Sequence, residues 1–235
     1  MAIELTRLSK SFEGLSVFED FSLSLSEQRV SAILGPSVCG KTTLLALIAG
    51  TLRSDTGSIS GVERRRIGYV FQEPRLLPWL TVRANVEFVL REIYDEAERR
   101  QVVAKWLALV GLEEFSGYYP DALSGGMRQR VAIARAFAVP STLLLLDEPF
   151  QALDLRRTLS LIEVFDTLWR IDRRTTIFVT HDLREALLLA DDLFVLSERP
   201  ARVLERMSVA GEHSARSLED SSLMEIQQKL YRMLA

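Results

Sequence analysis

The stretch that most restricts this chain lies at residues 35–42, Gly-Pro-Ser-Val-Cys-Gly-Lys-Thr. It matches the pattern G-x-x-x-x-G-K-[ST], and it stands between an apolar run, Val30 to Leu34, and a predicted helix at 41–50. A strand, a glycine loop and a helix in this order direct backbone N–H groups at one anion. The lysine of the pattern contacts the phosphates, and the hydroxyl of the Ser or Thr contacts Mg²⁺. The sequence therefore predicts a polyphosphate site. The alternative, an ordinary turn with an incidental lysine, is disfavoured because the chain has only 4 lysines.

Composition narrows the classes of protein to which the chain can belong. With 235 residues, 48% of them hydrophobic, the chain is long enough for one domain with a substantial core. The net charge of −3 gives no basic excess, so we expect no nucleic-acid partner. Cys39 is the single cysteine, which excludes an intrachain disulfide. The N-terminus has no secretory signal pattern, and no apolar run approaches the roughly 20 residues of a membrane span.

Hydrophobic patterning predicts an α/β fold with a mostly parallel core sheet and an antiparallel β part at the N-terminus. Apolar alternation fills the first 34 residues, with a turn at Glu13-Gly14. Further strands are predicted at 58–59 and 67–71, joined by a charged turn at 63–66, and at 142–146, 176–180 and 192–196. Helices are predicted at about 155–170 and 183–190, between the last three of these strands.

The segment from about 74 to 140 is mostly helical in its patterning, with periodic apolar residues from 82 to 97 and from 102 to 110. We interpret it as a helical subdomain inserted in a core of about 1–73 and 141–235, all within one domain of 235 residues. An amphipathic helix is predicted at 222–235, and His213 before it is interpreted as solvated.

A second motif carries two acids. Four leucines, Leu143 to Leu146, lead into Asp147 and Glu148. A buried parallel strand delivers such residues to its carboxyl end, where α/β sheets bind ligands. Asp147 is the candidate Mg²⁺ ligand, and Glu148 is the candidate group that polarises a water. Strands often end in acids, so this motif gains weight only with the glycine loop.

A third motif, residues 123–130, reads Leu-Ser-Gly-Gly-Met-Arg-Gln-Arg. Its glycines expose backbone amides where a helix begins, which favours a second anion site, although a turn capped by Ser124 is the simpler alternative. Together the three motifs resemble the ATP-binding subunits of ABC transporters, whose own signature is this octet. The resemblance covers Phe12 to about Leu196 and implies the P-loop NTPase fold of an ABC ATPase.

The resemblance implies a role for each candidate residue. It implies catalytic roles for Glu148, His181 and Gln72. Mg²⁺ contacts are implied for Thr42, Gln72 and Asp147. ATP contacts are implied for Phe12, Gly35, Pro36, Ser37, Val38, Cys39, Gly40, Lys41, Thr42 and Thr43. Ser124, Gly125 and Gly126 would cover the ATP of a second copy placed head to tail, and Asp154, after Leu153, would lie in a loop that crosses the dimer interface.

The stretch 71–82 resembles the importer ATPases of the nitrate/sulfonate/taurine group, which includes transporters of thiamine-precursor-like compounds. An exposed apolar loop, Leu76 to Trp79, would contact the transmembrane permease subunits; the alternative is that it folds back onto the helical insertion. The implied function is ATP-driven import of a small solute, supplied indirectly by a solute-binding protein. The implied location is peripheral, at the cytoplasmic face of the inner membrane.

Two residues depart from the family pattern. Val38 stands where the family usually has glycine, and a positive φ there would cost a β-branched residue on the order of 1–3 kcal/mol. Strain confined to the bound loop would weaken ATP binding by roughly 5- to 150-fold. Gln151 replaces the usual serine or glycine. Val38 keeps open the alternative of a catalytically impaired nucleotide-binding scaffold. A second alternative, independent of these departures, is an ABC ATPase outside transport.

Overall fold

The computed structural model describes residues 2–62, 66–151 and 154–234 of the 235-residue chain. Residues 63–65 of the expected charged turn and Leu153 lie outside the described residues. By compactness the chain forms two units. The first comprises Met1–Arg65, Leu145–Glu148 and Arg173–Ala235, and the second comprises Arg66–Leu144 and Pro149–Asp172.

The first unit contains an antiparallel sheet at the N-terminus, as the alternation predicts. Its strands β1 (Ile3–Phe12), β2 (Leu15–Leu25) and β4 (Thr56–Ser60) lie in the order β2-β1-β4. Glu13 and Gly14 form the turn between β1 and β2 with φ of 48° and 84°. Two consecutive positive φ angles match the right-handed twist of a hairpin.

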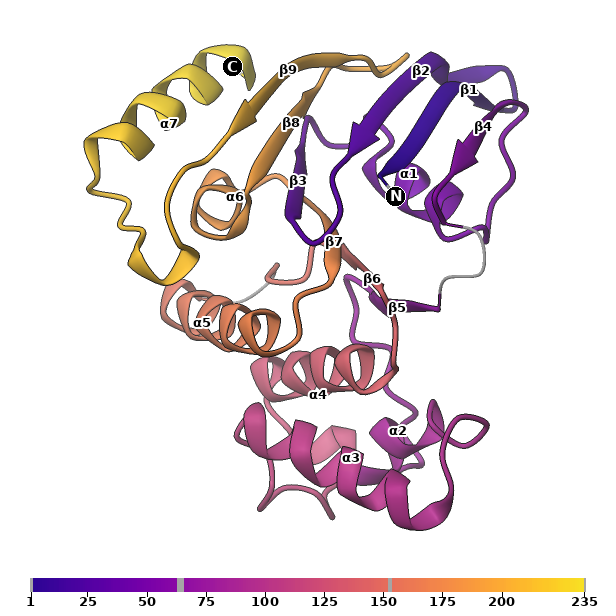
Figure 1. Ribbon diagram of the computed structural model, residues 1–235, viewed down its shortest axis with the longest axis vertical. Helices are drawn as coiled ribbons and strands as arrows, with labels where there is room; N and C mark the ends of the chain where they lie inside the picture. The colour runs from indigo at the N-terminus through magenta and orange to yellow at the C-terminus, as the bar shows by residue number, and fades with distance from the viewer. Residues whose placement is uncertain (1, 63–65, 152–153, 235) are drawn as a thin grey trace. The chain divides into compact units, whose positions relative to one another are not determined.

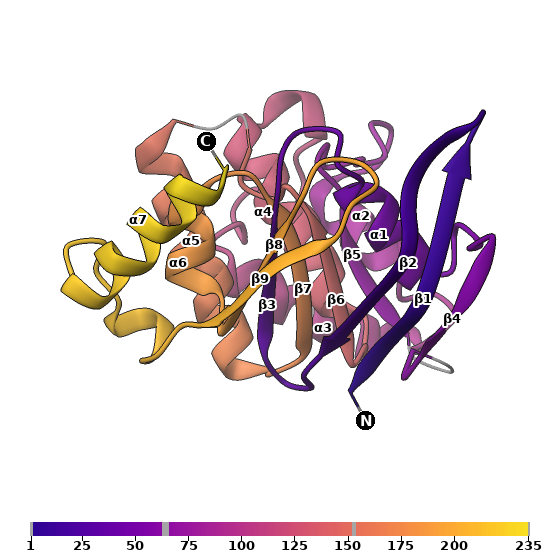
Figure 2. The same ribbon diagram turned by 90° about the horizontal axis from the view of Figure 1, so that it is seen from above.

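The larger sheet of this unit carries the predicted phosphate loop. Its strands are β3 (Val30–Leu34), β7 (Thr175–Thr180), β8 (Asp192–Leu196) and β9 (Val203–Ser208), with the end of β6 (Leu143–Asp147) beside β7. β3 pairs in parallel with β7 and with β8, while β9 pairs antiparallel with β8 (Figures 1 and 2). Every residue of β3, β7 and β8 is buried, which explains why these strands are mostly apolar and do not alternate with charged residues.

Helices α1 (Lys41–Ile48), α6 (Leu183–Leu189) and α7 (Ser221–Leu234) complete the first unit. α1 contacts β7, and α6 contacts β3 and β7. α7 packs on α6 and buries Leu223 and Leu230, as its amphipathic pattern predicts. Among the described residues, no helix combines the length and the apolar character needed to span a bilayer.

The interpretation of His213 as solvated is wrong. The short 3₁₀ helix η2 (His213–Ala215) contacts α6, and the His213 side chain is 4% exposed. Its Nε2 atom lies 3.3 Å from Oδ1 of Asp191. Nearby, the Arg216 guanidinium donates to backbone carbonyls that include those of Ala190 and Gly211, at 2.7 and 3.0 Å. These long-range contacts bury a segment whose local composition is polar.

The second unit is organised around α4. Its elements are β5 (Ile67–Val70), α2 (Val82–Phe88), α3 (Glu96–Leu109), the 3₁₀ turn η1 (Pro120–Ala122), α4 (Gly125–Ala138) and α5 (Leu155–Ile171). α4 contacts α2, α3, β5 and α5 (Figure 1). Compactness thus groups β5 and α5 with the helices between 74 and 140. The helical subdomain of about 74–140 expected from the sequence stays a prediction.

The helical periodicity predicted from 82 to 97 is interrupted in the structure. α2 ends at Phe88, and α3 begins at Glu96. Asp95 is the N-cap of α3, where its carboxylate accepts a hydrogen bond from the Glu98 N–H at 2.9 Å. This cap starts a new helix within a pattern that suggested a continuous one.

Candidate functional site

The loop between β3 and α1 has the geometry of an anion cradle. Gly40 is the N-cap of α1 at φ 116°, and a Cβ there would lie 2.5 Å from Cγ1 of Val17. A Cβ at Gly35 would lie 2.9 Å from Sγ of Cys39. Glycine is therefore required at both positions. Because Gly40 has no side chain with which to cap α1, it leaves the first N–H groups of the helix open to an anion.

Lys41 and Thr42 begin α1 at this cradle. The Lys41 side chain is buried, and its Nζ donates to the carbonyls of Gly35 and Pro36 at 2.8 and 2.9 Å. These bonds hold the ammonium group against the loop. The Thr42 hydroxyl donates to Oδ1 of Asp147 at 3.0 Å, which brings two of the three predicted Mg²⁺ ligands together.

The Thr42–Asp147 pair fits Mg²⁺ because both partners offer hard oxygen ligands. Among the described residues, no three His, Cys, Asp or Glu side chains gather in a way that could hold a metal ion. Mg²⁺ commonly binds through one or two protein oxygens, with substrate phosphates completing its shell. The donor set therefore suits Mg²⁺ delivered with a polyphosphate.

Glu148 and His181 form the second pair of the site. Glu148 follows β6, has φ 43°, and donates its backbone N–H to the Val179 carbonyl at 3.0 Å. His181 follows β7, and its Nδ1 lies 3.1 Å from Oε2 of Glu148. The Glu148 side chain is 19% exposed and the His181 ring 53%. A carboxylate aligned by an imidazole at the carboxyl ends of parallel strands can orient a water for attack.

Sequence reasoning missed Glu185, which lies on α6 close to this pair. The side chain is 4% exposed and accepts a hydrogen bond from the Thr180 hydroxyl. Burial, with a smaller effect from the charges of Asp182 and Glu148, raises the pKa of Glu185 from 4.5 to about 7. The only local signal is a glutamate on an otherwise apolar face of α6.

The raised pKa makes stability depend on pH. Folded Glu185 keeps a proton that the unfolded chain releases, so its contribution to stability falls as pH rises from about 4.5 to about 7. We expect Glu185→Gln to raise the free energy of unfolding by about 3 kcal/mol more at pH 8 than at pH 4.5. Urea unfolding at both values measures this difference. Glu219→Gln, at an exposed glutamate, is the control, and equal effects at both pH values would contradict the expectation.

Val38 does adopt the left-handed region, with φ 62°, and its side chain is 77% exposed. The positive φ considered from the sequence is therefore present in the loop. Strain that is common to the free and bound loop cancels from the affinity and appears in the stability instead. Neighbouring Cys39 is buried, and burial raises the pKa of its thiol, which disfavours the reactive thiolate.

We expect Val38→Gly to raise the free energy of unfolding by about 1 kcal/mol, since relief of the left-handed strain exceeds the added backbone entropy of glycine. ATP affinity should change by less than about threefold. Denaturant unfolding and calorimetric ATP titration measure the two effects, with Val38→Ala as the control that keeps a Cβ. A tenfold gain in affinity at unchanged stability would show that the strain arises on binding.

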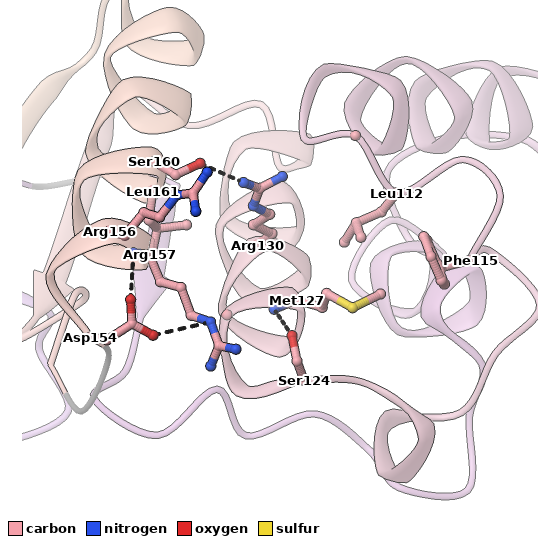
Figure 3. A pocket seen from close by; sticks show the side chains of 12 residues that line it. Leu112, Phe115, Ser124, Met127, Arg130, Asp154, Arg156, Arg157, Ser160 and Leu161 are labelled. Carbon is pink, nitrogen blue, oxygen red and sulfur yellow. Dashed lines mark hydrogen bonds and ion pairs between the residues drawn. The ribbon is translucent and has the colours of Figure 1, made fainter.

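The signature segment lies in the second unit. Ser124 is the N-cap of α4, and its Oγ accepts a hydrogen bond from the Met127 N–H at 3.3 Å. Asp154 is the N-cap of α5, accepts from the Arg157 N–H at 3.1 Å and pairs with the Arg157 side chain at 3.2 Å. Both helix starts line one pocket of about 640 Å³ (Figure 3).

The pocket in Figure 3 combines positive charge with an apolar floor. Arg130, Arg156 and Arg157 line it, and Arg130 donates to the Ser160 hydroxyl at 2.9 Å. Its apolar lining comes from Leu112, Phe115, Met127 and Leu161. The three guanidinium groups outnumber the one carboxylate of the pocket, Asp154, so the lining is positively charged and favours an anionic occupant.

Gln72 lies in the second unit and is exposed just beyond β5. Its side chain is hydrogen-bonded to Gln151, the second residue that departs from the family pattern. The other candidate residues group as follows. Lys41, Thr42, Asp147, Glu148 and His181 lie in the first unit, which also holds Phe12 at the end of β1 with its ring 43% exposed.

The Leu76–Trp79 loop is rigidly held, which the sequence did not indicate. Asn85, 1% exposed on α2, accepts from the Leu77 N–H at 2.7 Å and donates to the Leu77 and Leu80 carbonyls at 3.1 and 3.0 Å. Leu76 and Leu77 are half-buried, whereas Trp79 is 70% exposed. The loop thus folds back in part and still presents its tryptophan.

A glycine cradle at a helix N-terminus, a buried lysine and two consecutive acids at the carboxyl end of β6 define a P-loop ATPase. The family model described as ABC transporter matches residues 18–151, and the chain belongs to this family. It is an ABC-type ATPase that binds ATP.

Relatives and solved structures give the same fold and class. The chain is 44% identical over 215 residues to the taurine import ATP-binding protein TauB of Yersinia pestis bv. Antiqua, covering 88% of this chain and 84% of that protein. It is 42% identical over 200 residues to the aliphatic sulfonates import ATP-binding protein SsuB 1 of Pseudomonas savastanoi pv. phaseolicola, with 85% and 82% coverage. A dimeric structure of MJ0796, a bacterial ABC transporter cassette, matches with a TM-score of 0.78 and 30% identity over 89% of this chain and 99% of that one.

Proposed function

We propose that this protein is the ATP-hydrolysing subunit of an importer for a small solute of the nitrate, sulfonate or taurine kind. The observation that carries the proposal is that one unit holds the Lys41 loop, the Thr42–Asp147 pair and the Glu148–His181 pair. The relatives named for taurine and aliphatic sulfonate import favour a sulfonate among these solutes, ahead of a thiamine precursor.

Each candidate site residue of the first unit has a task in the proposed reaction. Residues 35–43 bind the phosphates of ATP through backbone N–H groups, and the Lys41 ammonium exchanges its loop carbonyls for phosphate oxygens. Thr42 and Asp147 would hold Mg²⁺, which would supply positive charge to the phosphates. Glu148 orients the attacking water, and His181 aligns Glu148 and faces the terminal phosphate. Phe12 offers an exposed ring on which adenine stacks.

A second copy of the chain completes the site. Ser124, Gly125 and Gly126 at the start of α4 are accessible, and the basic pocket beside them suits a nucleotide held by the partner. Asp154, exposed at the start of α5, lies at the proposed interface. ATP then favours the closed pair because only the closed state lets both copies contact it, and hydrolysis removes that preference. The dimeric MJ0796 structures support this arrangement.

The partner in the membrane is the transmembrane permease, contacted through the Leu76–Trp79 loop. Trp79 is exposed on a loop that Asn85 holds in place, and a hollow of about 310 Å³ lies beside it, lined by Tyr69, Phe71, Leu77, Phe88 and Arg135 among others. An exposed apolar surface on a rigid support is typical of a protein interface. The protein accordingly works at the cytoplasmic face of the inner membrane, and a solute-binding protein acts on it only indirectly.

A dimerisation experiment tests whether ATP closes a pair of these subunits. Glu148→Gln protein is examined by light scattering with and without Mg²⁺-ATP, and a doubling of mass with ATP is expected. Gly126→Arg, which places a bulky side chain at the signature segment, should stay monomeric. A Glu148→Gln protein that remains monomeric even with glycine restored at position 38 would contradict ATP-driven pairing by this chain alone.

Uptake tests the transport role. Cells in which Glu148→Gln replaces the native residue are assayed for uptake of labelled taurine, an alkanesulfonate, nitrate and a thiamine-precursor pyrimidine. Loss of taurine or alkanesulfonate uptake alone is expected. If uptake of all four compounds is retained, the alternative of an ABC ATPase outside transport replaces the proposal.

A further inference from the structure

A buried hydrogen-bond relay supports the turn that carries His181. Thr180, the last residue of β7, is 1% exposed, and its hydroxyl donates to Oε2 of Glu185. The same hydroxyl oxygen accepts a hydrogen bond from the Asp182 N–H at 3.0 Å. Glu185 lies on the first turn of α6 and is 4% exposed. The relay therefore joins the residue before His181, the residue after it and α6, all within the first unit.

The relay differs from the usual closure of a helix start. Asp182 is the N-cap of α6, and Glu185 stands three positions later, which is the spacing of a capping box. In that motif the glutamate accepts directly from the N–H of the N-cap residue. Here the Thr180 hydroxyl stands between the two, accepting from Asp182 and donating to Glu185. A direct cap would stabilise α6 alone, whereas this arrangement also ties the end of β7 to α6.

Further contacts hold the same turn. The Asp182 carboxylate accepts from the Arg184 N–H at 2.8 Å and from Nε of Arg184 at 3.1 Å. Thr180 pairs with Leu34 in the parallel register of β7 with β3, and Leu34 directly precedes the phosphate loop. The backbone on both sides of His181 is thus held beside the strand that leads into that loop.

The His181 ring depends on this backbone for its direction. The ring is 53% exposed, so packing contributes little to its orientation. Its Nδ1 lies 3.1 Å from Oε2 of Glu148. With Nδ1 at Glu148, Nε2 is the ring nitrogen that can reach a phosphate. A shift of the turn would therefore disturb both contacts of the imidazole.

We propose that Glu185 is a positioning residue for His181, acting through the Thr180 hydroxyl on the turn that carries the imidazole. The inference rests on the role proposed above for His181. When the relay is broken, the turn is held by fewer bonds, and the ring points at Glu148 and the terminal phosphate for a smaller share of the time. Turnover depends on that alignment. Binding of ADP does not, because ADP lacks the terminal phosphate.

The experiment compares Thr180→Val, which keeps the shape and removes the hydroxyl, with Thr180→Ser, which keeps the hydroxyl. The readouts are kcat and KM for ATP hydrolysis. Thr180→Val is expected to lower kcat about 10-fold with KM within about twofold, because alignment matters mainly in the transition state. Thr180→Ser should retain the wild-type values. Thr176→Val makes the same change in a buried threonine near the opposite end of β7 and is the matched control.

Glu185 supplies a second pair of variants. Glu185→Leu removes the acceptor and should lower kcat by a similar factor, whereas Glu185→Gln keeps an acceptor oxygen and should retain the wild-type kcat. Thermal unfolding checks that each variant folds, and calorimetric titration with ADP should give the wild-type affinity. Wild-type kcat in both Thr180→Val and Glu185→Leu overturns the inference. A loss of ADP affinity together with turnover also overturns it, because the phosphate loop itself is then disturbed.

The histidine ring signals in NMR spectra give a readout that does not depend on turnover. The chain has two histidines, and His213 lies on η2, which also contacts α6. In Thr180→Val the His181 signals should move while those of His213 stay. If both move, α6 as a whole has loosened, and if neither moves, the turn is unaffected; either result overturns the inference.

A double-mutant cycle tests whether the relay acts through His181. In a His181→Ala background, Thr180→Val should have no further effect on kcat, because the residue to be positioned is gone. An undiminished effect there would mean that the relay acts by another route, which overturns the inference. If His181→Ala alone hydrolyses ATP at the wild-type rate, the role proposed for His181 fails instead, so the two failures are distinguishable.

Discussion

Glu148→Gln is expected to lower the steady-state rate of ATP hydrolysis by about 10²- to 10⁴-fold, the usual contribution of a positioned general base. The Glu148 side chain is 19% exposed and aligned by His181 at 3.1 Å, so the carboxylate is held where a water can be oriented. Glutamine keeps the size and the contact to His181 but cannot accept a proton. ATP affinity should stay within about twofold. Phosphate release and calorimetric ATP titration measure the two quantities.

Glu198→Gln, at an exposed glutamate of the same unit, is the matched control and should hydrolyse ATP at the wild-type rate. Multiple turnovers by Glu148→Gln above a tenth of the wild-type rate would exclude Glu148 as the base. Loss of ATP affinity together with turnover would point instead to disruption of the adjoining Thr42–Asp147 pair.

The parts of the fold that the sequence predicts are those in which local pattern and burial agree. β3, β7 and β8 are buried at every residue, so each carries a short cluster of apolar residues with no alternation of exposed positions. The phosphate loop is predictable for a related reason. Gly40 meets Val17 too closely to carry a Cβ, and Lys41 must begin the helix, so spacing and residue type are both fixed.

Other features depend on contacts between distant residues and leave little trace in the local sequence. β9 is a sheet-edge strand with alternating exposure, and only its pairing with β8 identifies it. His213 is buried because η2 packs on α6. The loop around Leu77 is held by Asn85, whose amide binds four backbone groups. The local sequence does not indicate these bonds.

The candidate site shows the same division. Motifs locate Lys41, Asp147 and His181, since each lies at the end of an element that the sequence predicts or directly next to one. Glu185 escapes this reasoning because its raised pKa comes from burial in the fold, with a smaller effect from the charges of Asp182 and Glu148. The positive φ of Val38 also needed the structure, because the residue type alone does not fix the backbone conformation of this loop.

Lys41→Ala is expected to weaken ATP binding by at least about 100-fold, because charge-assisted hydrogen bonds to phosphate contribute roughly 1.5–3 kcal/mol each. The loop should persist in part, since the bonds from Lys41 to the Gly35 and Pro36 carbonyls can be replaced by water. Calorimetric titration with ATP measures the affinity, and thermal unfolding checks the fold. Lys229→Ala removes an exposed lysine paired with Glu205 at 3.1 Å and should bind ATP normally. Equal affinities for Lys41→Ala and wild type would refute the assignment of the phosphate loop, because no other lysine begins a helix behind a glycine cradle in the sequence.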